Sequence, residues 1–130
     1  MMEVLKIESL KLSERSSTEI STIKRNTKIE TMNVICRWAL TVSLSSDLPP
    51  PPLAKEDKIL REIDWKIFAG DYEHLIMALL KDRMNQEKIK LNNESINDQL
   101  RAHVQRGLSL IAAQKNIRSI ADFTELALSS

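Results

Sequence analysis

One segment of the chain, residues 31–45, carries apolar side chains on two sides of a helix. The first stripe recurs at three- and four-residue intervals and contains Val34, Ile35, Trp38, Ala39 and Val42. The second stripe recurs at intervals of four residues and contains Met32, Cys36, Leu40 and Leu44. A helix at the surface of a globular protein needs only one apolar face. This segment is therefore predicted to be either a central core helix or a helix at a subunit interface.

The composition limits what can surround such a helix. The chain has 130 residues, of which 42% are hydrophobic, and it contains only two glycines. This size allows one modest core, and the scarcity of glycine disfavours both a turn-rich all-β fold and a glycine-rich phosphate loop. With 19 basic and 18 acidic side chains, the net charge is +1. Any binding to DNA must therefore depend on local charge asymmetry.

The sequence predicts a cytoplasmic protein that does not enter a membrane. Cys36 is the single cysteine, so an intramolecular disulfide is impossible. The first residues lack the pattern of a secretory signal peptide, and no apolar stretch approaches the roughly 20 residues that span a bilayer.

The first 48 residues have the outline of a ribbon-helix-helix unit. Residues 2–12 alternate roughly between apolar and polar, as expected for a short strand, and Ser13 is suited to cap a helix over residues 14–26. The helix over residues 31–45 follows. Such units usually dimerise by pairing their strands across a twofold axis.

The prolines at 49–52 cannot continue a helix, so residues 49–62 are predicted to be a connector containing a stiff polyproline segment. Residues 63–67 alternate like a short strand, although residues 55–63 could be helical instead. Residues 63–114 form the predicted second helical part.

Two longer helices are expected in this second part. The first starts at Tyr72 after an Asp71 N-cap and ends near residue 85, with an apolar stripe of Tyr72, Leu75, Ile76, Leu79, Leu80 and Met84. The second covers about residues 95–114. Its predicted buried face contains Ile96, Leu100, His103, Val104, Gly107, Leu108 and Ile111.

Gly107 within a helix indicates close approach by another backbone or a ligand. Ser119 and Asp122 predict a last short helix to residue 128, within a tail of residues 115–130. The fold class is thus mainly α, a single domain over residues 1–130 with a short N-terminal strand.

No pattern predicts catalysis, a metal or a cofactor. Cys36, His74 and His103 are scattered and form neither a CxxC nor an HExxH arrangement. Cys36 as a sulfur carrier and His103 as a base are open alternatives, but their places on apolar stripes favour buried thiol and imidazole groups. Cys36, Leu40 and Leu44 are the candidates for a subunit interface.

Local charge favours contact with phosphates more than the net charge does. Residues 99–121 contain four cations and no acid, and residues 22–38 contain four cations against Glu30. The predicted phosphate-binding residues are Lys24, Arg25, Lys28, Arg37, Arg101 and Arg106. The alternative is that these are ordinary solvated cations, since Arg101 and Arg106 lie about 140° apart around a helix.

Three short blocks are uncommon enough to indicate a family. They are Arg25-Asn26-Thr27 with Asn33-Val34-Ile35-Cys36-Arg37-Trp38-Ala39 and Ser43-Leu44, then Trp65-Lys66-Ile67-Phe68-Ala69-Gly70, then His103-Val104-Gln105-Arg106-Gly107. In this order the chain resembles the DndE family of DNA sulfur modification proteins, over about residues 10–112. Met32 and Gln105 stand where the resemblance predicts an aromatic residue and a second histidine.

The resemblance implies a non-catalytic, oligomeric accessory protein of DNA phosphorothioation that binds duplex DNA and prefers nicks. Its expected partners are the ATP-using sulfur-transfer enzyme and the cysteine desulfurase system, which replace a non-bridging phosphate oxygen by sulfur. A ribbon-helix-helix transcriptional regulator and a protein-interaction scaffold without DNA contact are the alternatives.

Overall fold

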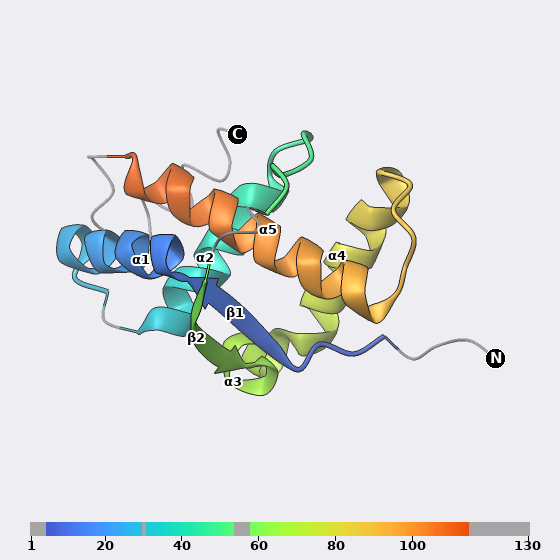
Figure 1. The fold of residues 1–130 in the computed structure, drawn as a ribbon, viewed down its shortest axis with the longest axis horizontal. Coiled ribbons are helices and arrows are strands. Elements are labelled where there is room, and N and C mark those ends of the chain that lie inside the picture. The colour runs from blue at the N-terminus through green and yellow to red at the C-terminus, as the bar shows by residue number, and fades with distance from the viewer. Residues whose placement is uncertain (1–4, 30, 54–57, 115–130) are drawn as a thin grey trace.

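The computed structural model describes residues 5–29, 31–53 and 58–114, which are mainly helical as predicted (Figure 1). The elements in chain order are β1 (Ser9–Ser13), α1 (Glu14–Thr27), α2 (Met32–Leu44), β2 (Ile59–Asp64), α3 (Trp65–Ala69), a single 3-10 turn (Gly70–Tyr72), α4 (Glu73–Gln86) and α5 (Asn93–Ala112). The prolines at 49–52 lie in a segment without helix or strand.

The N-terminal strand-helix-helix order is confirmed, and local capping explains where α1 begins and ends. The backbone N–H of Ser16 donates to Ser13 Oγ over 3.1 Å, which confirms Ser13 as the N-cap. At the other end Lys28 adopts a left-handed conformation with φ of 63°, and its N–H donates to Lys24 O. This residue turns the chain away from α1 toward α2.

Strand β1 pairs with β2 of the same chain, so the two halves of the sequence share one antiparallel sheet. Leu10 stands opposite Ile63 and Leu12 opposite Arg61. The strand predicted over residues 63–67 is wrong beyond Asp64, because the Asp64 carboxylate accepts from the Lys66 N–H and starts α3. In a helix Trp65 and Phe68 fall on one face, and both are buried.

Helix α2 is the centre of the core, and α5 lies directly against it. A Cβ atom added to Gly107 would lie 1.8 Å from Ala39 O, so the two backbones touch where only glycine fits. This confirms the predicted close approach. The α5 face predicted to be buried is also confirmed, since all of its members are buried: Ile96, Leu100, His103, Val104, Gly107, Leu108 and Ile111.

Helix α4 uses only half of its predicted apolar stripe in the core. Ile76, Leu80 and Met84 are buried, whereas other members of the stripe keep much of their surface in solvent: Tyr72 (56%), Leu75 (55%) and Leu79 (45%). The predicted Asp71 cap is wrong, because a 3-10 turn precedes the helix and no side chain caps it.

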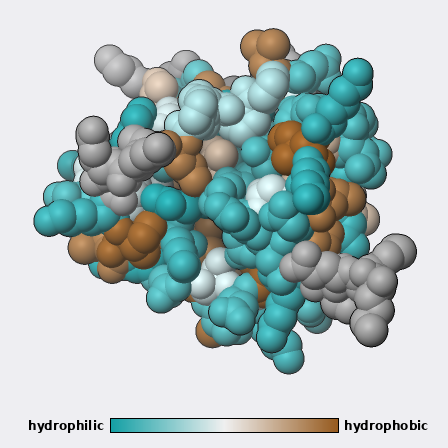
Figure 2. Space-filling model, turned by 45° about the vertical axis from the view of Figure 1, so that its right-hand side comes forward, coloured by the Kyte–Doolittle hydropathy of each residue, from teal (hydrophilic) through white to brown (hydrophobic). Residues whose placement is uncertain are grey.

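The face drawn in Figure 2 is largely hydrophilic with separate hydrophobic patches. Within the described ranges, no helix combines the length and the hydropathy that crossing a membrane requires. The tail of residues 115–130 and the short helix predicted in it lie outside the described residues.

Candidate functional site

Three of the predicted phosphate-binding residues meet at the C-terminal end of α1. Lys24 and Arg25 occupy the last turn, and Lys28 is the C-cap. Arg25 and Lys28 are exposed and Lys24 is half-buried. None of them forms an ion pair with a described carboxylate, the single described ion pair being Arg15–Glu19. We refer to Lys24, Arg25 and Lys28 as the α1 basic tip.

The backbone under the basic tip is held by a threonine. Thr27 is buried, and its hydroxyl donates to Ile23 O over 2.7 Å while accepting from the Ile29 N–H over 3.2 Å. The hydrogen bonds of Thr27 thus fix the backbone on both sides of the left-handed Lys28. The three cations therefore project from a helix end with a defined conformation. Cations at the C-terminal end of a helix also interact favourably with the partial negative charge of the helix dipole.

Arg37 lies elsewhere, beside an apolar groove between α2 and α4. Its guanidinium carbon is 5.7 Å from the centre of the Tyr72 ring, a cation–π distance. The structure therefore pairs Arg37 with an aromatic residue that sequence reasoning did not select as a site residue.

The two α5 arginines of the predicted set are both half-buried. Arg106 is a structural clamp: its Nε donates to Ser43 Oγ, its Nη2 to Ser43 O and its Nη1 to Leu48 O, over 2.7–2.8 Å. Arg101 is half-buried, and its Nε is shielded from solvent without a partner among the described residues. The hydrogen bonds of Arg106 therefore give it a packing role between α5 and the end of α2.

A second arginine completes this clamp. Arg83 of α4 donates to Leu44 O over 2.6 Å and to Ser46 O over 2.8 Å. The last carbonyls of a helix have no partner within the helix and carry partial negative charge. Two guanidinium groups from neighbouring helices therefore satisfy the end of α2. The sequence offered no signal for Arg83, because its acceptors are brought to it only by folding.

His103 and Ser43 form a buried pair next to the clamp. Ser43 Oγ and His103 Nδ1 lie 2.8 Å apart, and both residues have 0% of their surface exposed. Burial first, then the nearby charges of Arg106 and Arg83, lower the pKa of His103 from 6.5 to about 4. The imidazole is therefore neutral at pH 7, and no substrate can reach it in this conformation.

The predicted interface residues divide between core and surface. Cys36 is fully buried, and burial raises the pKa of its thiol to about 12. It therefore offers no surface to a second copy, contrary to its selection as an interface residue, and the thiol stays protonated at neutral pH. Leu44, half-buried, and the edge of Leu40 line the α2–α4 groove.

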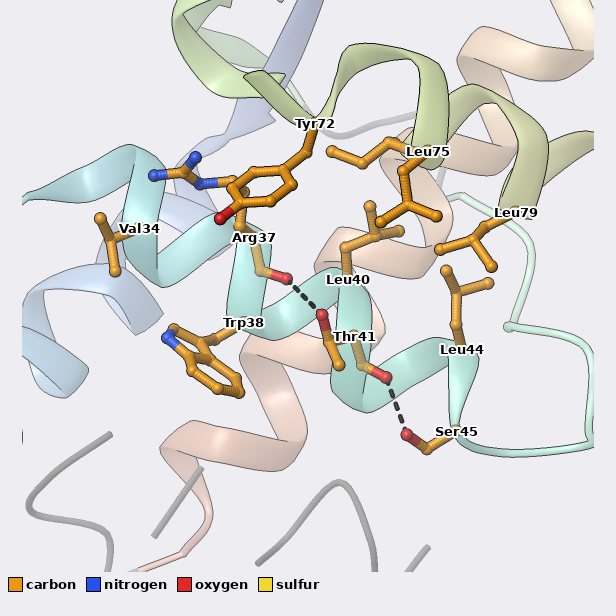
Figure 3. A pocket seen from close by; sticks show the side chains of 11 residues that line it. Val34, Arg37, Trp38, Leu40, Thr41, Leu44, Ser45, Tyr72, Leu75 and Leu79 are labelled. Carbon is orange, nitrogen blue, oxygen red and sulfur yellow. Dashed lines mark hydrogen bonds between the residues drawn. The ribbon is translucent and has the colours of Figure 1, made fainter. Parts of the chain in front are cut away.

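The groove has a volume of about 580 Å³ and opens between α2 and α4 (Figure 3). Its lining is Val34, Arg37, Trp38, Leu40, Thr41, Leu44 and Ser45 from α2 with Tyr72, Leu75, Ile76 and Leu79 from the α4 side. Figure 3 shows Leu75 and Leu79 facing Leu40 and Leu44 across it. Arg37 is the single charged residue of this lining. In the part of the chain that the structure describes, no three His, Cys, Asp or Glu side chains are grouped to hold a metal.

These features define a small helical protein with a ribbon-helix-helix-like N-terminal half, an exposed basic helix end and an apolar groove. The chain belongs to the DndE family, since residues 9–119 match the family model described as DNA sulphur modification protein DndE. This confirms the family predicted from the three sequence blocks.

A solved structure shares the fold. The crystal structure of DndE from Escherichia coli B7A, involved in DNA phosphorothioation modification, is similar with a TM-score of 0.67 and 22% sequence identity. The similarity covers 84% of this chain and 99% of that chain. No curated protein is significantly similar in sequence to the chain.

Proposed function

We propose that this protein is a non-catalytic, DNA-binding accessory subunit of the phosphorothioation machinery. It acts as a cytoplasmic homo-oligomer and reads the backbone or nicks of duplex DNA rather than base sequence. Its partners are the sulfur-transfer enzyme and the cysteine desulfurase system. The family supports the pathway, and the observation that carries DNA binding is the exposed α1 basic tip.

The charge and form of the basic tip fit a phosphate backbone. Lysine and arginine side chains supply the sequence-independent part of DNA affinity. Here three of these side chains project from one helix end, and no described carboxylate lies within ion-pair distance of them. One such tip gives few phosphate contacts. Repetition of the tip by the symmetry of an oligomer multiplies those contacts, which supports an assembly as the binding species.

The absence of catalysis is part of the proposal and is supported by burial. A sulfur carrier needs an accessible thiolate, whereas Cys36 is buried with a raised thiol pKa. A general base must reach its substrate's proton, whereas His103 is enclosed and hydrogen-bonded to Ser43. The alternatives that give either residue a chemical role thus require the core to open.

The test is fluorescence anisotropy with intact, nicked and single-stranded versions of one oligonucleotide at several salt concentrations. The variant Arg25→Gln/Lys28→Asn removes two charges, and asparagine tolerates the left-handed backbone at position 28. Loss of two phosphate contacts should weaken binding and lower the slope of log K against log salt by about 2 per bound chain. Wild-type protein should prefer the nicked duplex.

Lys88 provides a matched control because it is the other described non-glycine residue with positive φ, 59°, and it also follows a helix end. Lys88→Asn/Lys90→Gln removes the same charge from the far end of α4. This control should bind like the wild type. Equal weakening in both double variants would show that total charge matters and would contradict a site at the basic tip.

The second candidate is a protein-interaction scaffold without DNA contact, which the open apolar α2–α4 groove favours. It predicts no binding to any oligonucleotide at low salt, together with complex formation by purified sulfur-transfer enzyme. A ribbon-helix-helix regulator receives less support, because β1 is already paired with β2 of its own chain.

A further inference from the structure

The α2–α4 groove is an apolar surface whose α4 side is only partly covered in the described structure. Tyr72, Leu75 and Leu79 keep 45–56% of their surface exposed, whereas Ile76, Leu80 and Met84 of α4 are buried. Large apolar side chains gathered in a hollow mark a surface that binds something. The question is which segment matches it in length, polarity and position.

We propose that the C-terminal segment of the same chain, residues 115–130, binds in this groove as a short amphipathic helix. The basis is a match between two parts of the chain: an apolar groove whose one charged residue is Arg37, and a C-terminal segment in which residues 119–128 carry a broad apolar face, two acids and no base. The inference is independent of DNA binding.

The side-chain pattern of the segment fits the groove. In a helix over residues 119–128, the apolar face is formed by Ile120, Phe123, Ala127 and Leu128. Asp122 and Glu125 lie on the narrow polar side, with Glu125 at the edge of the apolar face. An acid at this edge is complementary to Arg37, which has no ion pair with a described carboxylate.

The point where the chain leaves α5 is at the correct end of the groove. Arg106 of α5 contacts Ser43 of α2. The next residue of α5, Gly107, contacts Ala39, which precedes Ser43 by four residues on α2. The two helices therefore run in opposite directions. Five residues beyond Gly107, at the end of α5, the neighbouring part of α2 is near Val34. Val34 lines one end of the groove.

The lengths also agree. The groove follows α2 from Val34 to Ser45, which is about 17 Å at 1.5 Å per residue. The predicted helix of ten residues is about 15 Å long. Residues 114–118, between the C-cap of α5 and position 119, can extend to about 17 Å. A helix that enters beside Val34 therefore brings Ala127 near Leu79 at the far end.

Disulfide trapping in the full-length chain tests this position. The variant Leu79→Cys/Ala127→Cys should form an intrachain disulfide under mild oxidation at least tenfold faster than His74→Cys/Ala127→Cys. His74 is exposed on α4 and lies about 140° around the helix from Leu79. Native Cys36 can stay in place, because its thiol is buried. Circular dichroism checks that both variants are folded.

Three results would overturn the proposal. Equal rates for the two pairs would show a segment without a fixed site. A disulfide-linked dimer in place of the intrachain product would show that a second copy covers the groove. A second pair, Leu75→Cys/Phe123→Cys, probes the middle of the groove. If neither this pair nor Leu79→Cys/Ala127→Cys forms a disulfide, the segment does not bind in the groove.

The charge pairing has its own test in the Leu79→Cys/Ala127→Cys background. Arg37→Glu should slow disulfide formation severalfold, and added Asp122→Lys/Glu125→Lys should restore the rate. High salt should reduce both effects, since the pair lies at the rim of the groove. A rate that Arg37→Glu leaves unchanged would overturn the proposed register of the segment.

Discussion

The two sides of α2 are built differently. Toward α5 the backbones touch at Gly107 and Ala39, and the buried Ser43–His103 pair and the Arg106 clamp lie beside that contact. Toward α4 the helices share buried residues along one edge and leave an apolar groove along the other. Both sides are apolar in sequence. Apolar periodicity therefore does not distinguish a closed contact from a binding surface, whereas a glycine and buried polar partners do.

The closed side should be the less tolerant of added volume. Gly107→Val should destabilise the protein by at least about 3 kcal/mol, because its Cβ would overlap the Ala39 carbonyl and α5 would have to move away. Urea unfolding measures the change. Leu110→Ala, an exposed site on the same helix, should change stability by less than about 1 kcal/mol. A small effect of Gly107→Val would mean that the contact is loose.

Acid should weaken the closed side through His103. The pKa of His103 is about 4 in the folded protein and 6.5 in the unfolded reference, so the unfolded chain binds the proton more readily between these values. The contribution of neutral His103 is therefore complete above pH 6.5 and is lost as the pH falls toward 4, by at most about 3 kcal/mol.

Urea unfolding between pH 7.5 and 4.5 checks this dependence. His103→Gln removes the titrating group, so its stability should fall less steeply over the same range, while carboxylate titration continues in both proteins. Parallel curves for the wild type and His103→Gln would show that another group carries the acid sensitivity.

Adjacent leucines on α4 compare the core with the groove. Leu80 is fully buried and Leu79 is 45% exposed. Leu80→Ala should cost about 3 kcal/mol, since it leaves a cavity, and Leu79→Ala less than about 1 kcal/mol. The difference in the free energy of unfolding, about 2 kcal/mol, measures how open this side is. Equal costs would show that Leu79 is as well packed in solution as Leu80.

The smallest effect is expected at the clamp. Arg106→Ala should destabilise by about 1.5 kcal/mol, because the carbonyls of Ser43 and Leu48 lose charged donors that are partly screened by solvent. Arg101→Ala should cost less than about 0.5 kcal/mol, as it has no hydrogen bond among the described residues. At a temperature where Arg106→Ala is folded, its DNA affinity should match the wild type.

The sequence alone was sufficient for features that neighbouring residues determine. The Ser13 cap, the extent of α1 and α2, the buried face of α5 and the close approach at Gly107 all followed from spacing within a few residues. The family followed from three short blocks. These signals are local because capping and helical periodicity involve residues at most four positions apart.

Tertiary structure decided everything that depends on which surfaces meet. The alternation of Ile63, Trp65 and Ile67 predicted a strand. The structure has a helix from Trp65 instead, because Asp64 caps it and Trp65 is buried together with Phe68. Local charge predicted Arg106 as a phosphate ligand, and only the fold shows that Arg106 also holds the Ser43 carbonyl at the end of α2. Pattern gives each helix its apolar face, but the partner of that face is set by packing between residues far apart in the chain.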